Sequence, residues 1–100
     1  MNGIKIELPQ EAIAEICKRH QVRELSVFGS AVRDDFTADS DIDFLVEFQP
    51  DAKIGFLEFA GMQIELAELL GRKVDLVSKN GLNPVIRDEI LDSSKVFYAA

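Results

Sequence analysis

The chain has 100 residues, 47% of them hydrophobic, which fits one compact α+β domain spanning residues 1–100. Eighteen acidic against eleven basic residues give a formal net charge of −7, which disfavours stable binding to nucleic acid or to an anionic membrane. The single cysteine, Cys17, excludes an internal disulfide, and no apolar run approaches the ~20 residues that span a bilayer. We therefore expect a cytoplasmic protein.

The first third of the chain predicts a helix, a strand and a short helical turn. Apolar residues at helical spacing follow Pro9, with basic residues near the end of the segment, as a helix dipole favours. The β-prone run 25–28 predicts a strand that ends at Gly29, where a residue without a side chain permits an abrupt change of direction. Ser30 then begins a short helical turn. The apolar helix face comprises Ile13, Ile16 and Cys17.

The middle third predicts a two-faced strand and a longer helix. Apolar residues occupy alternate positions from 41 to 48, so Asp41 and Asp43 share the opposite face. Residues 56–70 then carry apolar side chains at helical intervals until Gly71 ends the helix. The apolar face assigned to this helix comprises Phe56, Phe59, Ala60, Leu66, Ala67 and Leu70, and the solvated face comprises Glu58, Glu65 and Glu68.

The last third predicts another strand and another helix. Residues 73–77 form a β-prone run interrupted by Asp75. Asn83 before Pro84 is a typical N-cap and first-turn pair, and the run 96–98 is β-prone again. Mixed elements with amphipathic helices predict a small mixed β-sheet flanked by helices, with the aspartates on its exposed face or rim.

The aspartates predict a magnesium site. Carboxylates two residues apart on a strand lie roughly 6 to 7 Å apart at the backbone, so Asp41 and Asp43 can lean together onto one or two hard cations. Two ions about 3.5–4 Å apart would activate an attacking hydroxyl and steady a triphosphate with its leaving pyrophosphate. Asp75 is placed to complete the set. The alternative is a solvated strand face, but aspartate is a poor strand former and clustered carboxylates repel without a cation.

Gly29 and Ser30 predict a phosphate-binding turn. Glycine allows the backbone to approach a phosphate, and Ser30 supplies a hydroxyl and an amide at the start of a helical turn. The alternative is an ordinary turn after a strand. Combined with the carboxylates, the turn predicts transfer of a nucleotidyl group from a nucleoside triphosphate to an acceptor hydroxyl.

Two further residues are candidates for the same site. Arg33 lies about one helical turn beyond Ser30 and can contact the triphosphate, although a surface arginine that balances Asp34 and Asp35 is equally consistent with the sequence. Ser40 can orient Asp41 by a hydrogen bond, and a turn-forming serine explains this position equally well.

His20 and Cys17 are assigned no catalytic role. His20 follows the first helix and has no partner at a metal-ligand spacing, so we interpret it as a complement to the helix dipole. Cys17 lies on the apolar helix face and is interpreted as part of the core.

The combination of Gly29-Ser30, ten further residues, Asp41-x-Asp43 and the later Asp75 resembles the minimal nucleotidyltransferase (MNT) family of the DNA polymerase β superfamily. The resemblance extends over nearly the whole chain, including the terminal helix that begins near Asn83-Pro84. It implies a polymerase β-like fold, ATP as the nucleotidyl donor, phosphate binding by the Gly-Ser pair, and binding of Mg²⁺ by the three aspartates. It also implies that Asp75 takes part in activating the acceptor.

The resemblance also implies a partner. Members of the family are commonly encoded beside a helical HEPN-domain protein and act as antitoxins, and some transfer AMP to a tyrosine of that partner, which silences its ribonuclease activity. By this resemblance we expect a HEPN-domain toxin as partner and substrate. Because so small a domain has limited surface for binding a protein, we expect a stable complex or a homodimer. Stable binding of nucleic acid and of membranes is not expected.

Alternatives follow from the departures of this chain from the family pattern. Many relatives carry arginine directly after Gly-Ser and glycine after the second arginine, where this chain has Ala31 and Asp34. These substitutions favour a non-catalytic antitoxin that neutralises its partner by steric binding. A third hypothesis is an enzyme that modifies a small molecule such as an antibiotic. Enzymes of this kind with related folds usually carry an added domain to hold the acceptor.

Overall fold

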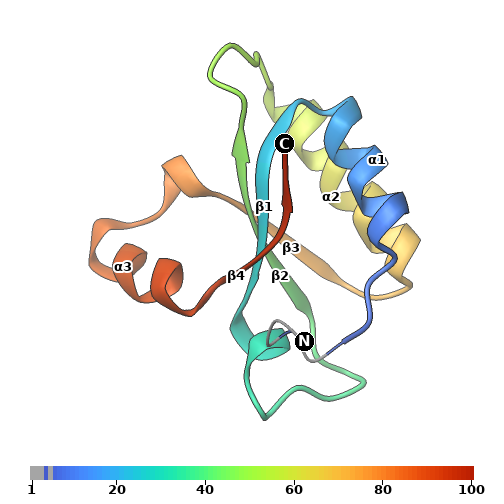
Figure 1. Cartoon of the computed structure of the whole chain (residues 1–100), viewed down its shortest axis with the longest axis vertical. Helices are drawn as coiled ribbons and strands as arrows, with labels where there is room; N and C mark the ends of the chain where they lie inside the picture. The colour runs from blue at the N-terminus through green and yellow to red at the C-terminus, as the bar shows by residue number, and fades with distance from the viewer. Residues whose placement is uncertain (1–3, 5) are drawn as a thin grey trace.

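The computed structural model describes residue 4 and residues 6–100, which fold into a four-stranded β-sheet flanked by helices (Figure 1). The strands follow the order β3-β2-β1-β4 across the sheet. Strand β1 is antiparallel to both β2 and β4, whereas β2 and β3 are parallel. The sheet is therefore mixed, as the sequence predicts. The strands are β1 (Val22–Phe28), β2 (Ile42–Phe48), β3 (Val74–Ser78) and β4 (Lys95–Ala99).

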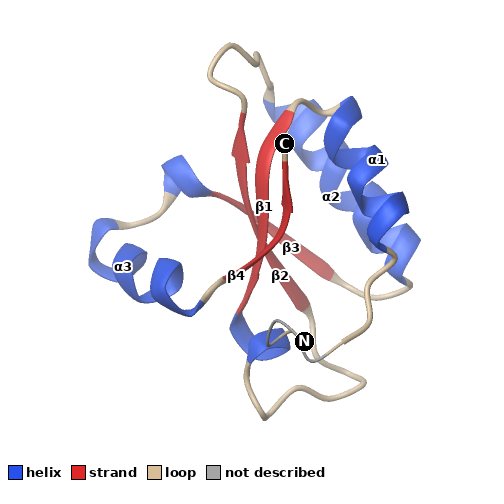
Figure 2. Cartoon of the chain, in the orientation of Figure 1, coloured by secondary structure: helices blue, strands red, loops and turns tan. Residues whose placement is uncertain are grey.

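Two helices pack together on one side of the strands (Figure 2). They are α1 (Gln10–Arg19) and α2 (Phe56–Leu70), and α2 is the crossover that a parallel β2–β3 pair requires. The alternating residues Ile42, Phe44 and Val46 of β2 are fully buried in this layer. The rest of the core comes mainly from α1, β1, α2 and β3, and includes Ile13, Cys17, Leu25, Val27, Met62, Leu66, Val74 and Leu76.

The third helix, α3 (Pro84–Ser93), lies apart from α1 and α2, across the strands (Figure 1). None of its residues is buried, and it contacts the short 3₁₀ turn η1 (Gly29–Val32) that follows β1. Its start is capped as the sequence predicts: the Asn83 side chain accepts a hydrogen bond from the Val85 amide at 2.9 Å, and Pro84 occupies the first helical position.

The structure confirms the predicted α+β class and the predicted helices and strands, and the β-prone run 96–98 lies in β4. One core assignment is wrong, because Phe56 is 82% exposed. The register of α2 that buries Met62 and Leu66 turns its first residue toward solvent. Within the described part of the chain, no helix is both long enough and apolar enough to cross a membrane.

Candidate active site

Asp43 and Asp75 lie side by side on adjacent strands. They are direct partners in the parallel register of β2 and β3, and Asp43 also pairs with Phe28 at the end of β1. Their neighbours in sequence, Ile42 and Val74, point into the core under the helices, so the two aspartates occupy the opposite face of the sheet. The predicted meeting of these two carboxylates is confirmed.

The environment of Asp43 disfavours the charged form of its carboxylate. Burial raises its pKa to about 6, and the charge of Asp75, a hydrogen bond with Asp75 and the charge of Asp41 act in the same direction, whereas Arg33 acts against them. Two adjacent carboxylates can relieve this repulsion by sharing a proton or by binding a cation. The pair is therefore a set of hard oxygen donors that a divalent metal ion fits.

Gly29 lies close to the carboxylate of Asp43. Its φ angle is +72°, which L-residues with a side chain rarely adopt, and this confirms the predicted change of direction after β1. A Cβ atom at Gly29 would lie 2.2 Å from Oδ2 of Asp43. Glycine is therefore required here by the backbone conformation and by the close approach of the carboxylate.

Ser30 is the second residue of the turn that Gly29 begins, and Arg33 directly follows that turn. The Ser30 hydroxyl donates a hydrogen bond to the backbone carbonyl of Asp41, with an oxygen–oxygen distance of 3.4 Å. Arg33 is exposed and donates from Nε to Asp35 at 3.2 Å, yet it is near enough to lower the pKa of Asp43. Arg33 therefore pairs with a surface aspartate, as one of its two sequence interpretations predicts, and its positive charge also acts on Asp43.

Asp41 and Ser40 lie in the segment directly before β2. One carboxylate oxygen of Asp41 is 3.8 Å from the Lys73 ammonium, so this aspartate is paired with a cation rather than with the other carboxylates. The Ser40 hydroxyl contacts Thr37, accepting from its amide at 3.0 Å, in agreement with the turn-forming interpretation. Among the described residues, no group of three or more His, Cys, Asp or Glu side chains is gathered closely enough to hold a metal ion. Of the three predicted metal ligands, Asp43 and Asp75 therefore form a close pair, and Asp41 lies separately.

The sequence interpretation missed two basic residues near Asp41. Arg72 donates to the backbone carbonyl of Ser40 at 3.0 Å, and Lys73 pairs with Asp41. Both directly precede β3, which carries Asp75. The sequence did contain a signal for these two residues, because both are basic and directly precede the strand that carries Asp75.

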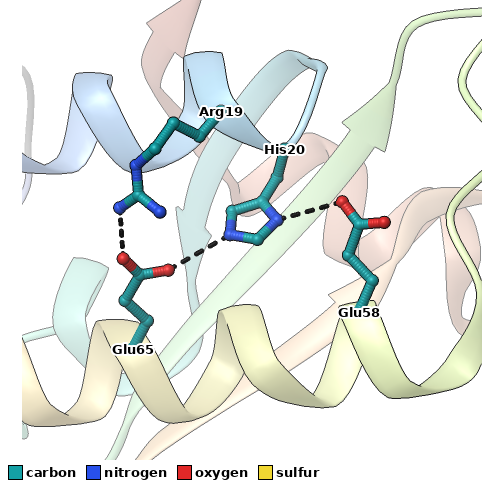
Figure 3. A network of polar contacts seen from close by, with 4 residues as sticks. All are labelled: Arg19, His20, Glu58 and Glu65. Carbon is teal, nitrogen blue, oxygen red and sulfur yellow. Dashed lines mark hydrogen bonds and ion pairs between the residues drawn. The ribbon is translucent and has the colours of Figure 1, made fainter.

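His20 is the C-cap residue of α1, as its interpretation as a dipole complement predicts, and Glu58 is exposed as predicted. Glu65, assigned to the solvated face, is half-buried, and the sequence interpretation missed the partners of His20. Figure 3 shows that these residues form a polar network with Arg19 between α1 and α2. The His20 ring nitrogens lie 3.2 Å from Glu58 and 3.1 Å from Glu65. Sequence periodicity places these glutamates away from the sheet, but it does not show that α1 lies beside them.

Comparison with known proteins assigns the chain to a family. A model described as a nucleotidyltransferase domain matches residues 10–97. The chain belongs to the nucleotidyltransferase family. It is 42% identical over 77 residues to the protein adenylyltransferase MntA of Thermococcus cleftensis, an alignment that covers 77% of this chain and 76% of that protein. The predicted resemblance and enzyme class are confirmed.

Two solved structures show that this nucleotidyltransferase shares its fold with proteins of more distant sequence. A crystal structure of a toxin–antitoxin with AMP-PNP contains a chain that is 20% identical, with a TM-score of 0.77, over 93% of this chain and 75% of that one. The second is a structure of a tri-AMPylated Shewanella oneidensis HEPN toxin in complex with MNT antitoxin. A chain of that structure is 19% identical to this chain, with a TM-score of 0.69, over 91% of this chain and 70% of that one.

Proposed function

We propose that this nucleotidyltransferase is a magnesium-dependent protein adenylyltransferase that moves AMP from ATP to a tyrosine hydroxyl of a HEPN-domain toxin, and that it acts as the antitoxin of that partner. The observation that carries the proposal is the close approach of Gly29 to Asp43, which is the register partner of Asp75. A phosphate-binding turn and a carboxylate pair in contact are what transfer of a nucleotidyl group requires. The name of the Thermococcus relative supports a protein as the acceptor.

The reaction joins the acceptor oxygen to the α-phosphorus of ATP. As this bond forms, the bond from the α-phosphorus to the bridging oxygen breaks, and pyrophosphate leaves with the bonding electrons. In our proposal the proton of the acceptor hydroxyl passes to Asp75, while the backbone of Gly29 and the hydroxyl of Ser30 hold the phosphates. Mg²⁺, held by Asp41, Asp43 and Asp75, would supply positive charge to the triphosphate and to the acceptor oxygen.

The position of the carboxylates suits a protein acceptor. Helices α1 and α2 cover the other face of the sheet, so the face that carries Asp43 and Asp75 is free of these two helices (Figure 2). An acceptor side chain can approach from that side, beside α3 and η1. The net charge of −7 disfavours nucleic acid as the acceptor.

The test is incubation of the purified chain with ATP, Mg²⁺ and the protein encoded beside it, followed by intact-mass measurement of both proteins. We expect the partner to gain AMP on a tyrosine, and the Asp41→Asn/Asp43→Asn double variant to abolish the gain while keeping the fold. The Asp51→Asn variant, which alters an exposed aspartate in a turn, is the matched control. Unchanged transfer by the double variant would overturn the proposal.

A second candidate is the antitoxin that neutralises its partner by steric binding alone. The observation that favours it is the ion pair of Asp41 with Lys73, because one predicted metal ligand already has a cationic partner. It predicts that the double variant still binds and neutralises the partner without any transfer of AMP. Loss of neutralisation together with loss of transfer would exclude it.

A further inference from the structure

Segment 33–41 connects the Gly29–Ser30 turn to the first residue of β2 and ends at Asp41. Most of this segment is exposed, including residues 33–35 and 37–39, whereas Phe36 is half-buried. Arg72 contacts the segment at two points. Its guanidinium carbon lies 5.1 Å from the centroid of the Phe36 ring, and its Nη1 donates to the carbonyl oxygen of Ser40 at 3.0 Å.

The contact with Ser40 matters because of what lies next to it. The Ser40 carbonyl belongs to the peptide group before the Cα of Asp41, and the Ile42 amide belongs to the peptide group after it. The Ile42 amide donates to the carbonyl of Lys73 at 3.1 Å. Both peptide groups that flank Asp41 are therefore held by consecutive residues at the start of β3, one by the Arg72 side chain and the other by the Lys73 backbone.

The chemistry of arginine suits this position. A planar guanidinium can lie over an aromatic ring and at the same time donate from its edge, whereas a lysine ammonium is a point charge with less directional preference. Arg72 is itself half-buried and directly follows Gly71, whose φ angle of +65° ends α2. The guanidinium therefore has two contacts, one with the Phe36 ring and one with the Ser40 carbonyl.

We propose that Arg72 is a positioning residue that holds Asp41 in place for metal binding, with Phe36 orienting the guanidinium. This inference has two parts. The statement that Asp41 binds a metal rests on the proposed function. The statement that Arg72 fixes the position of Asp41 does not, because the contacts of Arg72 with Phe36 and Ser40 involve no metal.

The first test measures amide hydrogen exchange in the metal-free protein by NMR. In Arg72→Ala, the Ile42 amide is expected to exchange about tenfold faster or more, because one of the two flanking anchors of Asp41 is lost. The core amide of Val27 should keep its rate, which shows that the domain is folded. Arg72→Lys and Phe36→Leu retain part of the contact and should give intermediate rates.

The matched control is Arg23→Ala. This variant removes the same charge from an exposed residue at the start of β1. The neighbours of Arg23 pair with the end of β2 that is far from Asp43. The variant is expected to leave the exchange of Ile42 unchanged. Equal exchange rates for Ile42 in Arg72→Ala, Arg23→Ala and the unsubstituted protein would overturn the proposal.

The second test measures binding of Mn²⁺, used in place of Mg²⁺, by electron paramagnetic resonance, together with AMP transfer at varied metal concentration. Arg72→Ala is expected to weaken Mn²⁺ binding about 10- to 100-fold, with a matching rise in the metal concentration needed for transfer. Unaltered Mn²⁺ affinity in Arg72→Ala would refute the positioning role. If the unsubstituted protein binds no Mn²⁺ and transfers no AMP, the proposed function fails, and the exchange measurement still decides whether Arg72 fixes Asp41.

Discussion

Gly29 and Asp43 approach each other so closely that a Cβ atom on the glycine would lie 2.2 Å from the carboxylate oxygen Oδ2. This contact joins the end of β1 to the centre of the candidate site, because Asp43 is also the register partner of Asp75. The turn that would receive the phosphates and the carboxylates that would hold the metal are therefore mechanically coupled. A side chain introduced at Gly29 would displace the carboxylate of Asp43.

Gly29→Ala is expected to slow AMP transfer strongly. The substitution introduces a methyl group into the space of the Asp43 carboxylate, and a displacement of about 1 Å in a site of this kind costs on the order of 100-fold in rate. Alanine also disfavours the left-handed conformation of Gly29 by about 1–2 kcal/mol. The measurement combines initial rates of transfer with urea unfolding.

Gly71→Ala is the control that separates these two effects. Gly71 has a similar φ angle of +65°, but no atom lies within 4 Å of a Cβ at that position. Gly71→Ala should therefore lose about 1–2 kcal/mol of stability from backbone strain and keep its activity. Equal activity losses in the two variants would show that strain, and not contact with Asp43, explains the effect.

Much of this architecture is encoded locally. Alternation over residues 41–48 correctly assigns Ile42, Phe44 and Val46 to the core and places Asp43 on the other face. The Asn83-Pro84 pair correctly predicts the start of α3, because an N-cap depends on neighbouring residues alone. These features follow from backbone geometry within a few residues, so no knowledge of the remaining fold is needed.

What the sequence does not encode locally is which elements become neighbours. The contact of His20 with Glu58 and Glu65 depends on α1 lying beside α2, and the contact of Arg72 with Ser40 joins two segments that are 32 positions apart. The exposure of Phe56 likewise depends on which side of α2 meets the sheet. Periodicity alone cannot supply these relationships, because it describes one element at a time.

Asp43→Asn is expected to stabilise the metal-free protein at alkaline pH. The pKa of Asp43 is about 6 in the folded chain against an ordinary value of 3.8, so the folded state binds more protons between these values. Its free energy of unfolding therefore falls as the pH rises through this window. The neutral amide removes this penalty, and we expect a gain of about 1–2 kcal/mol at pH 8 after allowance for partial solvent exposure.

Urea unfolding in the presence of EDTA across the acid-to-alkaline range would measure this gain, with Asp51→Asn as the control in an exposed turn. The gain should disappear at acid pH, where Asp43 is protonated in both states. Magnesium should stabilise the unsubstituted protein more than Asp43→Asn. A variant that is less stable than the unsubstituted protein at pH 8 would contradict the electrostatic account.

Glu65→Gln is expected to weaken the packing of α1 on α2. A hydrogen bond from Arg19 holds the pKa of Glu65 below its ordinary value, with His20 acting in the same direction. The stabilisation is therefore present above the unfolded pKa and is lost as the pH falls through the lower folded pKa. We expect the urea midpoint of Glu65→Gln to fall by about 0.3 M at neutral pH and to match that of the unsubstituted protein in strong acid.

The control for this substitution is Glu68→Gln, which changes an exposed glutamate of the same helix. High salt should reduce the difference between Glu65→Gln and the unsubstituted protein, because ions screen a partly exposed pair. Equal midpoints for Glu65→Gln and Glu68→Gln at neutral pH would show that the network in Figure 3 does not stabilise the contact of α1 with α2.

Asn83→Ala is expected to loosen α3 without unfolding the domain. The Asn83 side chain accepts the Val85 amide hydrogen, and loss of such a cap costs about 1 kcal/mol, equivalent to roughly a fivefold change in an opening equilibrium. Because α3 contains no buried residue, its opening exposes little of the core, and its stability depends strongly on its first turn. Amide exchange within α3 should therefore accelerate about fivefold while Val27 in β1 is unaffected.

The control for this substitution is Asn80→Ala, in the 3₁₀ turn η2 (Lys79–Gly81), which should leave amide exchange in α3 unchanged. A uniform acceleration that includes Val27 would instead mean that α3 opens only when the whole domain unfolds.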